Sequence, residues 1–329
     1  MTGIKQNKVY YPELDIIKGI AILLVIYGHS MCYFPINIRD MFPSLAYDAV
    51  TKFHMQLFFI ASGFLFSTKD TWRDFLKKKS IRILIPYIAF CLLDGLLRYI
   101  AAPFTRSHVQ ENILYVIVNG THYWFLHALF FIYIITKLAN GKRWIYLLMM
   151  LLSVSLYLLL PDGDWKEILG LGHIIYFLAW FIAGIFLREI YAKINTYLNK
   201  WWIILLLALL SGITLVFGLN KFFVVTWYIY PVLCSLLIWS ISTALVNTVW
   251  TQKGFAYFGK YSLQFYINHH VISLGAYYVP YLLNLTNPFI CLGSVFVTQI
   301  IIAWIMLIIE DTNNITRFIS GIPLKNTKV

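Results

Sequence analysis

The chain alternates long apolar runs with short polar or basic segments. A helix needs about 20 mostly apolar residues to cross the hydrocarbon core of a bilayer. The pattern predicts ten such helices, at residues 16–34, 47–67, 82–103, 122–139, 144–160, 171–191, 201–219, 223–248, 261–282 and 287–309. A short amphipathic piece, "QENILYVIVNG", is expected at the membrane surface before the fourth. The predicted fold is therefore all-α, a polytopic membrane helical bundle of about ten transmembrane helices.

Composition agrees with this fold class. The chain has 60% hydrophobic and 12% charged residues, whereas soluble domains carry about 25% charged residues. No internal repeat or low-complexity segment is recognisable, and we expect no cleavable signal peptide, because Lys5 and Lys8 lead directly into a long apolar run. We expect residues 1–329 to form a single integral-membrane domain with no soluble domain.

The net charge of +12 predicts orientation. Basic residues collect in the segments "KDTWRDFLKKKSIR", "KLANGKR" and "REIYAKINTYLNK", which all fall on one side of the predicted membrane. The other side holds little beyond Arg39, Arg106, Lys166 and Lys221. Because loops rich in lysine and arginine stay in the cytoplasm, both termini are expected there. The positive charge is then explained by the orientation of the chain in the membrane. We expect membrane lipid as a partner and no nucleic acid.

The cysteines show no pattern of a metal site or a disulfide framework. The four cysteines lie in or beside apolar runs, without metal-ligand or disulfide spacing, so we expect packing roles and no metal site. They are Cys32, Cys91, Cys234 and Cys291.

The histidines all fall away from the cytoplasmic side. His29 lies fourteen residues after Asp15, which is about 21 Å along a helix, in the outer half of the membrane. Ionisable residues at such depth usually serve a function. The others lie at outer span entrances, near mid-membrane or in an outer loop, where imidazoles can also be simple interfacial residues; they are His54, His108, His122, His127, His173, His269 and His270.

Five motifs follow one another along the chain: "LDIIKGIAILLVIYGHS", "FHMQLFFIASGFLF", "KKKSIRILIPY", "HYWFLHALF" and "FGKYSLQFYINHH". In this order they resemble the motifs of the acyltransferase family three membrane proteins, most of all those of the fucose 4-O-acetylase-like branch. The resemblance implies a sugar O-acyltransferase of the bacterial cytoplasmic membrane. It further implies an acyl-CoA donor, commonly acetyl-CoA, and a sugar or glycan acceptor, with no bound cofactor. It makes His29 the leading catalytic residue and Lys79 and Arg82 a donor-binding pair, although the family often has arginine at both positions.

The chemistry of such a transfer fits these residues. A sugar hydroxyl is a poor nucleophile at neutral pH, so a general base is needed, and histidine suits that role. CoA is polyanionic, so its phosphates call for a cationic cytoplasmic site, which the run from Lys77 to Arg82 offers. The same run also serves as a topology signal, the favoured reading for Lys77 and Lys78, whereas donor binding is favoured for Arg82.

Further polar residues complete the predicted site. Asp15 and Lys18 are spaced as a one-turn ion pair or as a donor contact, and Asp94, four residues before Arg98, is a candidate partner that orients His29. Asn268 and His269 are candidate donors to an oxyanion or a sugar. His54 and Trp124 are candidate substrate contacts, the tryptophan by stacking on a sugar. The glycines of "ASGF" and "LGLG" are expected to permit close helix packing.

Two other functions remain compatible with buried polar residues in a membrane bundle. A glycan or lipid transporter would line a pathway with them, although such proteins often show inverted repeats and broken helices. A regulatory protein that keeps the fold without catalysis is the second. Acceptor identity, acyl-chain length, oligomeric state and the choice between direct transfer and an acyl-histidine intermediate stay open.

Overall fold

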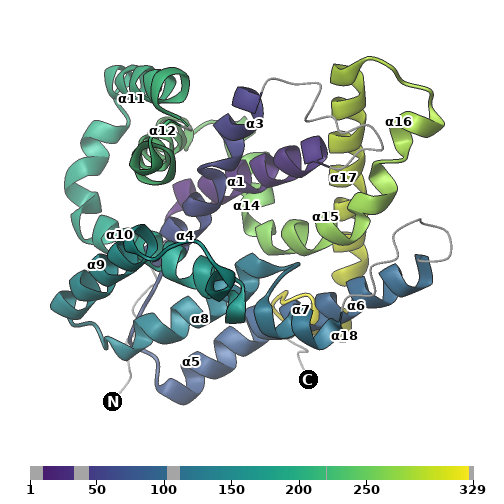
Figure 1. Cartoon of the computed structure of the whole chain (residues 1–329), viewed down its shortest axis with the longest axis horizontal. Helices are drawn as coiled ribbons and strands as arrows, with labels where there is room; N and C mark the ends of the chain where they lie inside the picture. Colours follow the sequence, from purple (N-terminus) through teal and green to yellow (C-terminus); the bar gives the residue numbers. More distant parts are fainter. Residues whose placement is uncertain (1–9, 33–43, 102–111, 220, 326–329) are drawn as a thin grey trace.

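The computed structural model describes residues 10–32, 44–101, 112–219 and 221–325, and all regular structure in these ranges is helical. Arg39, Arg106 and His108 lie outside the described residues. The helices form one bundle (Figure 1). The all-α prediction is confirmed.

Every predicted span coincides with a helix or a pair of helices. Those with one main helix are α1 (Pro12–Cys32), α6 (Ile85–Ala101), α8 (Trp124–Leu138), α9 (Arg143–Leu159), α10 (Leu171–Leu198), α11 (Trp201–Ile213), α12 (Tyr230–Leu245) and α17 (Pro288–Glu310). The second span is divided into α3 (Ser44–Thr51) and α4 (His54–Phe64), and the ninth into α15 (Ser262–Ala276) and α16 (Val279–Leu282). The remaining α-helices are α5 (Trp72–Lys79), α7 (Ile113–Asn119), α13 (Val249–Lys253), α14 (Phe255–Lys260) and α18 (Asn314–Ile319), and short 3-10 and π-helical segments accompany them.

The count of ten spans is not confirmed. Within the described ranges, six helices are long and apolar enough to cross a membrane, or seven if α7 and α8, bent by 45°, form one span. The difference has a physical cause, since α4 and α15 have 11 and 15 residues, and at 1.5 Å per residue neither covers a core about 30 Å thick.

Glycines set the closest helix contacts. A Cβ atom built on Gly63 of α4 would lie 1.8 Å from the carbonyl oxygen of Phe181 in α10, and one on Gly184 of α10 would lie 2.1 Å from that of Ile60. The same relation joins α1 to α14 through Gly19. The predicted packing role of the "ASGF" glycine is thus confirmed, because only a residue without a side chain allows this approach.

The core is rich in aromatic rings, while apolar side chains also cover the outside. Phe59 stacks on Phe177 with ring centroids 4.4 Å apart. Trp201, Leu205 and Leu209 of α11 are exposed, as expected for a helix face against lipid chains. Cys91, Cys234 and Cys291 are buried free thiols, which confirms their packing roles.

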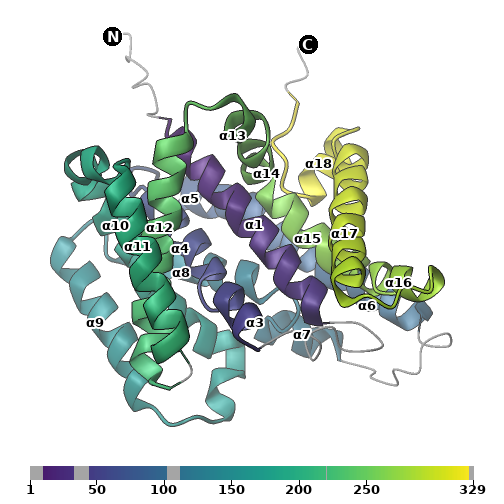
Figure 2. The same cartoon turned by 90° about the horizontal axis from the view of Figure 1, so that it is seen from above.

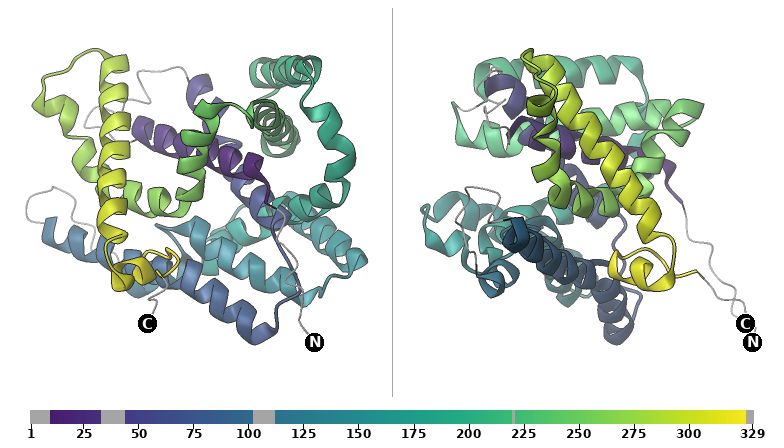
Figure 3. Two further views of the ribbon diagram at one scale, coloured as in Figure 1. Left: turned by 180° about the vertical axis from the view of Figure 1, so that it is seen from behind. Right: turned by 90° about the vertical axis from the view of Figure 1, so that its right-hand side faces the viewer.

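The two ends of the bundle differ. In Figure 2, the start of α1 and α18 lie toward one edge, and α3 and α7 lie toward the opposite edge. Both views of Figure 3 show α17 passing beside α15. We refer to the edge with α3 and α7 as the α7 end, and to the other as the α18 end.

Candidate active site

A cavity of about 630 Å³ opens at the α7 end. Residues of α1, α3, α4, α7, α8 and α10 line it, including three of the histidines, His29, His54 and His173. The predicted orientation places this end outside the cytoplasm. If that prediction holds, the cavity opens on the outer side of the membrane.

His54 stands at the break between α3 and α4. Its Nδ1 donates a hydrogen bond to the carbonyl of Val50 at 2.9 Å, which leaves the other ring nitrogen as an acceptor. Tyr47 and Thr51, just before the break, also line the cavity. Irregular backbone at membrane depth is tolerated where it borders a cavity, so the broken span is explained by the site.

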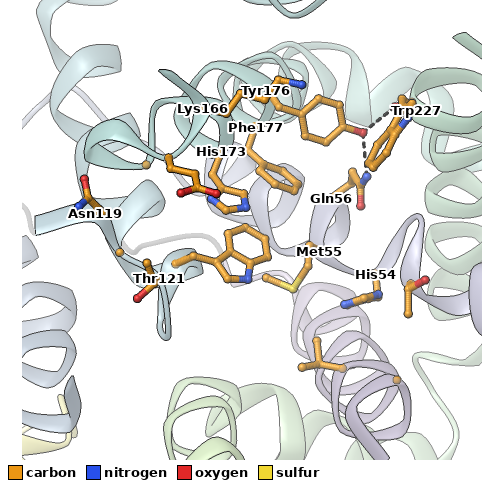
Figure 4. Close-up of a pocket in the computed structure, with 18 of the residues that line it drawn as sticks. His54, Met55, Gln56, Asn119, Thr121, Lys166, His173, Tyr176, Phe177 and Trp227 are labelled. Atoms are coloured by element: carbon orange, nitrogen blue, oxygen red, sulfur yellow. Dashed lines mark hydrogen bonds between the residues drawn. The ribbon is translucent and has the colours of Figure 1, made fainter. Parts of the chain in front are cut away.

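Aromatic rings form the opposite wall. Trp124 stacks on His173 with ring centroids 4.3 Å and planes 18° apart, and on Phe177 at 5.2 Å. In Figure 4, Gln56 donates to the hydroxyl of Tyr176, which donates to the carbonyl of Trp227. Asn119, Thr121, Lys166 and Glu167 add polar groups. Apolar ring faces combined with hydrogen-bonding groups suit a polar ligand such as a sugar.

His29 contacts other imidazoles in the core. Its ring lies 5.0 Å from that of His269 and 6.4 Å from that of His270. His269 is 1% exposed and donates from Nδ1 to the carbonyl of Phe265. Its Nε2 is a buried acceptor without a hydrogen-bond partner among the described residues. The structure thus brings together His29 of α1 and His269 of α15, which are 240 positions apart in sequence.

Asn268 is separated from this pair. Adjacent helical residues point about 100° apart, and the fully buried Asn268 lies beside the carboxyl group of Glu310 in α17. The structure therefore does not place Asn268 beside His29.

Asp94 takes a different partner from the one the sequence suggests. Its Oδ2 accepts hydrogen bonds from Nδ1 of His122 and from Nε of Arg98, both at 2.8 Å. Ligand atoms of Asp94, His122 and His270 lie within 4.8 Å of one another, a spacing compatible with a metal ion. The guanidinium of Arg98 opposes a cation there, so a hydrogen-bonded acid–imidazole cluster describes the group better.

The donor candidates lie toward the α18 end. Asp15 and Lys18 form a 2.6 Å ion pair, as their spacing predicts. Lys79 holds its ammonium 3.2 Å from the ring centroid of Tyr133. Arg82 lies in a π-helical turn, Ser80–Leu84, and is exposed.

Lys78 has a local partner in the same region. It pairs with Asp70 at 2.7 Å, and the ammonium lowers the pKa of that carboxyl group. A lysine paired in this way is less available for a ligand phosphate, which agrees with its predicted topological role.

The profile of a family described as "Acyltransferase domain" matches residues 11–308. The chain belongs to acyltransferase family three. It is a polytopic membrane member of an acyl-transferring family, as the five motifs indicated.

Two relatives are curated proteins called nodulation protein NolL. The one from Sinorhizobium fredii (strain NBRC 101917 / NGR234) is 33% identical over 141 residues, which cover 40% of this chain and 38% of the relative. The one from Mesorhizobium japonicum (strain LMG 29417 / CECT 9101 / MAFF 303099) is 32% identical over 134 residues, 39% of this chain and 35% of the relative. The chain thus matches little more than a third of either relative's length. No solved structure matches it significantly.

Several residues around His29 escape sequence reasoning. Tyr277, Gln299 and Ser30 form a hydrogen-bonded chain that ends on the backbone of His29. His122 stands two positions before Trp124 in a motif already singled out, yet nothing in one sequence links it to Asp94 on another helix.

Proposed function

We propose that this protein is a membrane O-acyltransferase that moves an acetyl or similar short acyl group from acyl-CoA to a sugar hydroxyl. The acceptor would be a cell-surface or lipid-linked glycan, and His29 the general base. The observation that carries the proposal is the position of His29, which lies in the last turn of α1 and lines the cavity at the α7 end.

The polar lining supports an acceptor of this kind. The hydroxyl of a sugar needs a base to become nucleophilic, and the imidazole of His29 reaches the cavity where such a hydroxyl would lie. Trp124 offers a ring surface, and Asn119 and Thr121 offer hydrogen-bonding groups. The ring of His269 packs behind that of His29, with centroids 5.0 Å apart, and its Nε2 is buried.

The donor is assigned to the opposite end. Arg82 is exposed beside a basic helix, where a polyanionic CoA would dock from the cytoplasm. Asp15, Lys18 and Lys79 are retained as weaker donor contacts, since each already has a partner within the protein. The acyl end of the donor would then reach His29 through the interior, with both termini on the donor side.

The test is His29→Ala in membranes that carry the producing cell's own glycans. Transfer from radiolabelled acetyl-CoA into alkali-labile glycan label should fall about 10²–10⁴-fold, the usual contribution of a positioned base. The matched control is His127→Gln, another buried imidazole, bonded to the carbonyl of Val118, which should retain transfer per molecule. Near-normal transfer by His29→Ala at equal abundance would defeat the assignment. Glycan NMR of cells with and without the gene would identify the sugar and the ester.

A further inference from the structure

A buried carboxylate holds the imidazole of His122 in place. Asp94 is 1% exposed, and its Oδ2 accepts from His122 Nδ1 and Arg98 Nε at 2.8 Å. A carboxylate only accepts hydrogen bonds from such partners, so the hydrogen of the His122 ring is on Nδ1. Its Nε2 then carries a lone pair that can take a proton.

This arrangement is known from acid–histidine pairs of hydrolases. There the acid fixes the tautomer of the imidazole and stabilises the positive charge that forms when the ring accepts a proton. Asp94 and His122 have the same contact. We call Asp94 and His122 the outer dyad.

Imidazole rings connect the outer dyad to His29. The ring of His122 lies 5.7 Å from that of His270, and the ring of His270 lies 6.4 Å from that of His29. The three rings come from three parts of the chain, the loop before α8, α15 and α1. One ring nitrogen of His270 lies within 4.8 Å of one of His122, so a relay requires side-chain rotations that bring neighbouring ring nitrogens within hydrogen-bonding distance.

A connection to the outer dyad would lower the electrostatic cost of protonating His29. When His29 takes a proton it becomes a cation inside the membrane, where an isolated charge is costly. The imidazoles of His269 and His270 pack against its ring, and His54 is near enough to interact with it electrostatically. A proton on His122 would instead lie next to the carboxylate of Asp94.

We propose that the outer dyad holds the proton of the acceptor hydroxyl during transfer, and that the proton reaches it from His29 through His270. The hydroxyl O–H bond breaks as its oxygen bonds to the thioester carbonyl carbon. The C–S bond then breaks, and the proton returns by the same route to the CoA thiolate. The products are the sugar ester and CoA thiol, with no net change in charge. This proposal rests on the assignment of His29 as the base.

A double-variant cycle tests it. In native membranes supplied with radiolabelled acetyl-CoA, Asp94→Asn should lower the rate at saturating donor by roughly 10²-fold and leave the donor KM unchanged. In a His29→Gln background the same change should cost nothing further, because residues that act as a unit are non-additive. His122→Gln, measured in the same way, should behave like Asp94→Asn.

The control is Asp48→Asn. Asp48 is also a buried acid, 8% exposed, with a basic residue four positions later, Lys52 at 3.9 Å, so it reports the general cost of neutralising such an acid. A multiplicative loss in both backgrounds would assign Asp94 a structural role and overturn the relay, as would full activity of Asp94→Asn at equal abundance. Full activity of His29→Gln would instead refute the proposed base, so the two failures are distinguishable.

Discussion

The hydroxyl of Tyr277 donates a 3.2 Å hydrogen bond to the backbone carbonyl of His29. The last four carbonyls of a helix have no partner inside it, and His29 lies in the last turn of α1. Gln299 of α17 donates to the same hydroxyl and accepts from Ser30. Two other chain segments, α17 and the residues just after α15, therefore hold the turn that carries the proposed base.

This contact predicts the effect of Tyr277→Phe. The ring would still fill its site, but the carbonyl of His29 would lose its donor, and a lost buried hydrogen bond costs about 1–3 kcal/mol. We expect a several-fold fall in transfer at saturating acetyl-CoA, with membrane abundance near normal. Quantifying both by labelled transfer and immunoblot checks this, and unaltered transfer would show that the turn is held without Tyr277.

Gly63→Ala should prevent correct assembly of the bundle. Its new methyl group would meet the Phe181 carbonyl oxygen at 1.8 Å, so α4 and α10 would have to separate. Overpacking of this kind costs at least about 1–3 kcal/mol. Gly212→Ala is the matched control, since nothing lies within 4 Å of its added Cβ. Detergent-solubilised yield and melting temperature are the measurements, and equal values for the two variants would contradict the packing argument.

The sequence predicts interactions between residues that are close along the chain, but not those between separate helices. Apolar runs locate helices, and spacing within one helix correctly indicated the ion pair of Asp15 with Lys18. The pair of Asp94 with Arg98 has the same kind of local spacing, although the sequence suggests His29 as the partner of Asp94. The apolar pattern continues through the break before His54, so the division of that span was not predictable. Tertiary packing alone decides such breaks.

Contacts between helices show the same limit. Depth along each span suggested that Asp94 and His29 lie at a similar level, but depth leaves the direction of a side chain undetermined. The structure turns Asp94 toward His122 and places His269, not Asn268, against His29. A single sequence contains no information on how the helices are rotated against one another.

The stacked rings at the cavity predict an effect on the acceptor. Trp124 lies flat against His173 and Phe177, so Trp124→Ala would remove a wall of the proposed sugar site. We expect the KM for glycan isolated from the producing cells to rise roughly tenfold, equivalent to about 1.4 kcal/mol of lost binding, with the acetyl-CoA KM unchanged. Trp124→Phe should recover much of the loss. A change in donor KM alone would move Trp124 out of the acceptor site.

Orientation is tested by reporter fusion. The asymmetry of lysine and arginine predicts that both termini are cytoplasmic, and the start of α1 and α18 do lie toward the same edge of the bundle (Figure 2). A reporter joined after residue 329 that works only in the cytoplasm should therefore be active. Activity only of a periplasmic or extracellular reporter would reverse the orientation and, with it, the sides assigned to donor and acceptor.

Arg82 provides the last prediction, at the donor end. Its side chain is exposed at a π-helical turn, where a guanidinium can bind a phosphate through two parallel hydrogen bonds. Arg82→Ala should raise the acetyl-CoA KM by about tenfold, since charge-assisted hydrogen bonds contribute about 1.5–3 kcal/mol, and should leave the glycan KM unchanged. Arg82→Lys should recover only part of the affinity, because an ammonium lacks the planar fork.

Lys77→Ala, which removes an exposed cation from the neighbouring helix α5, is the control and should change the donor KM little. Equal effects of Arg82→Ala and Lys77→Ala would reduce the site to general surface charge, and an unchanged donor KM in Arg82→Ala would remove this residue from the donor site.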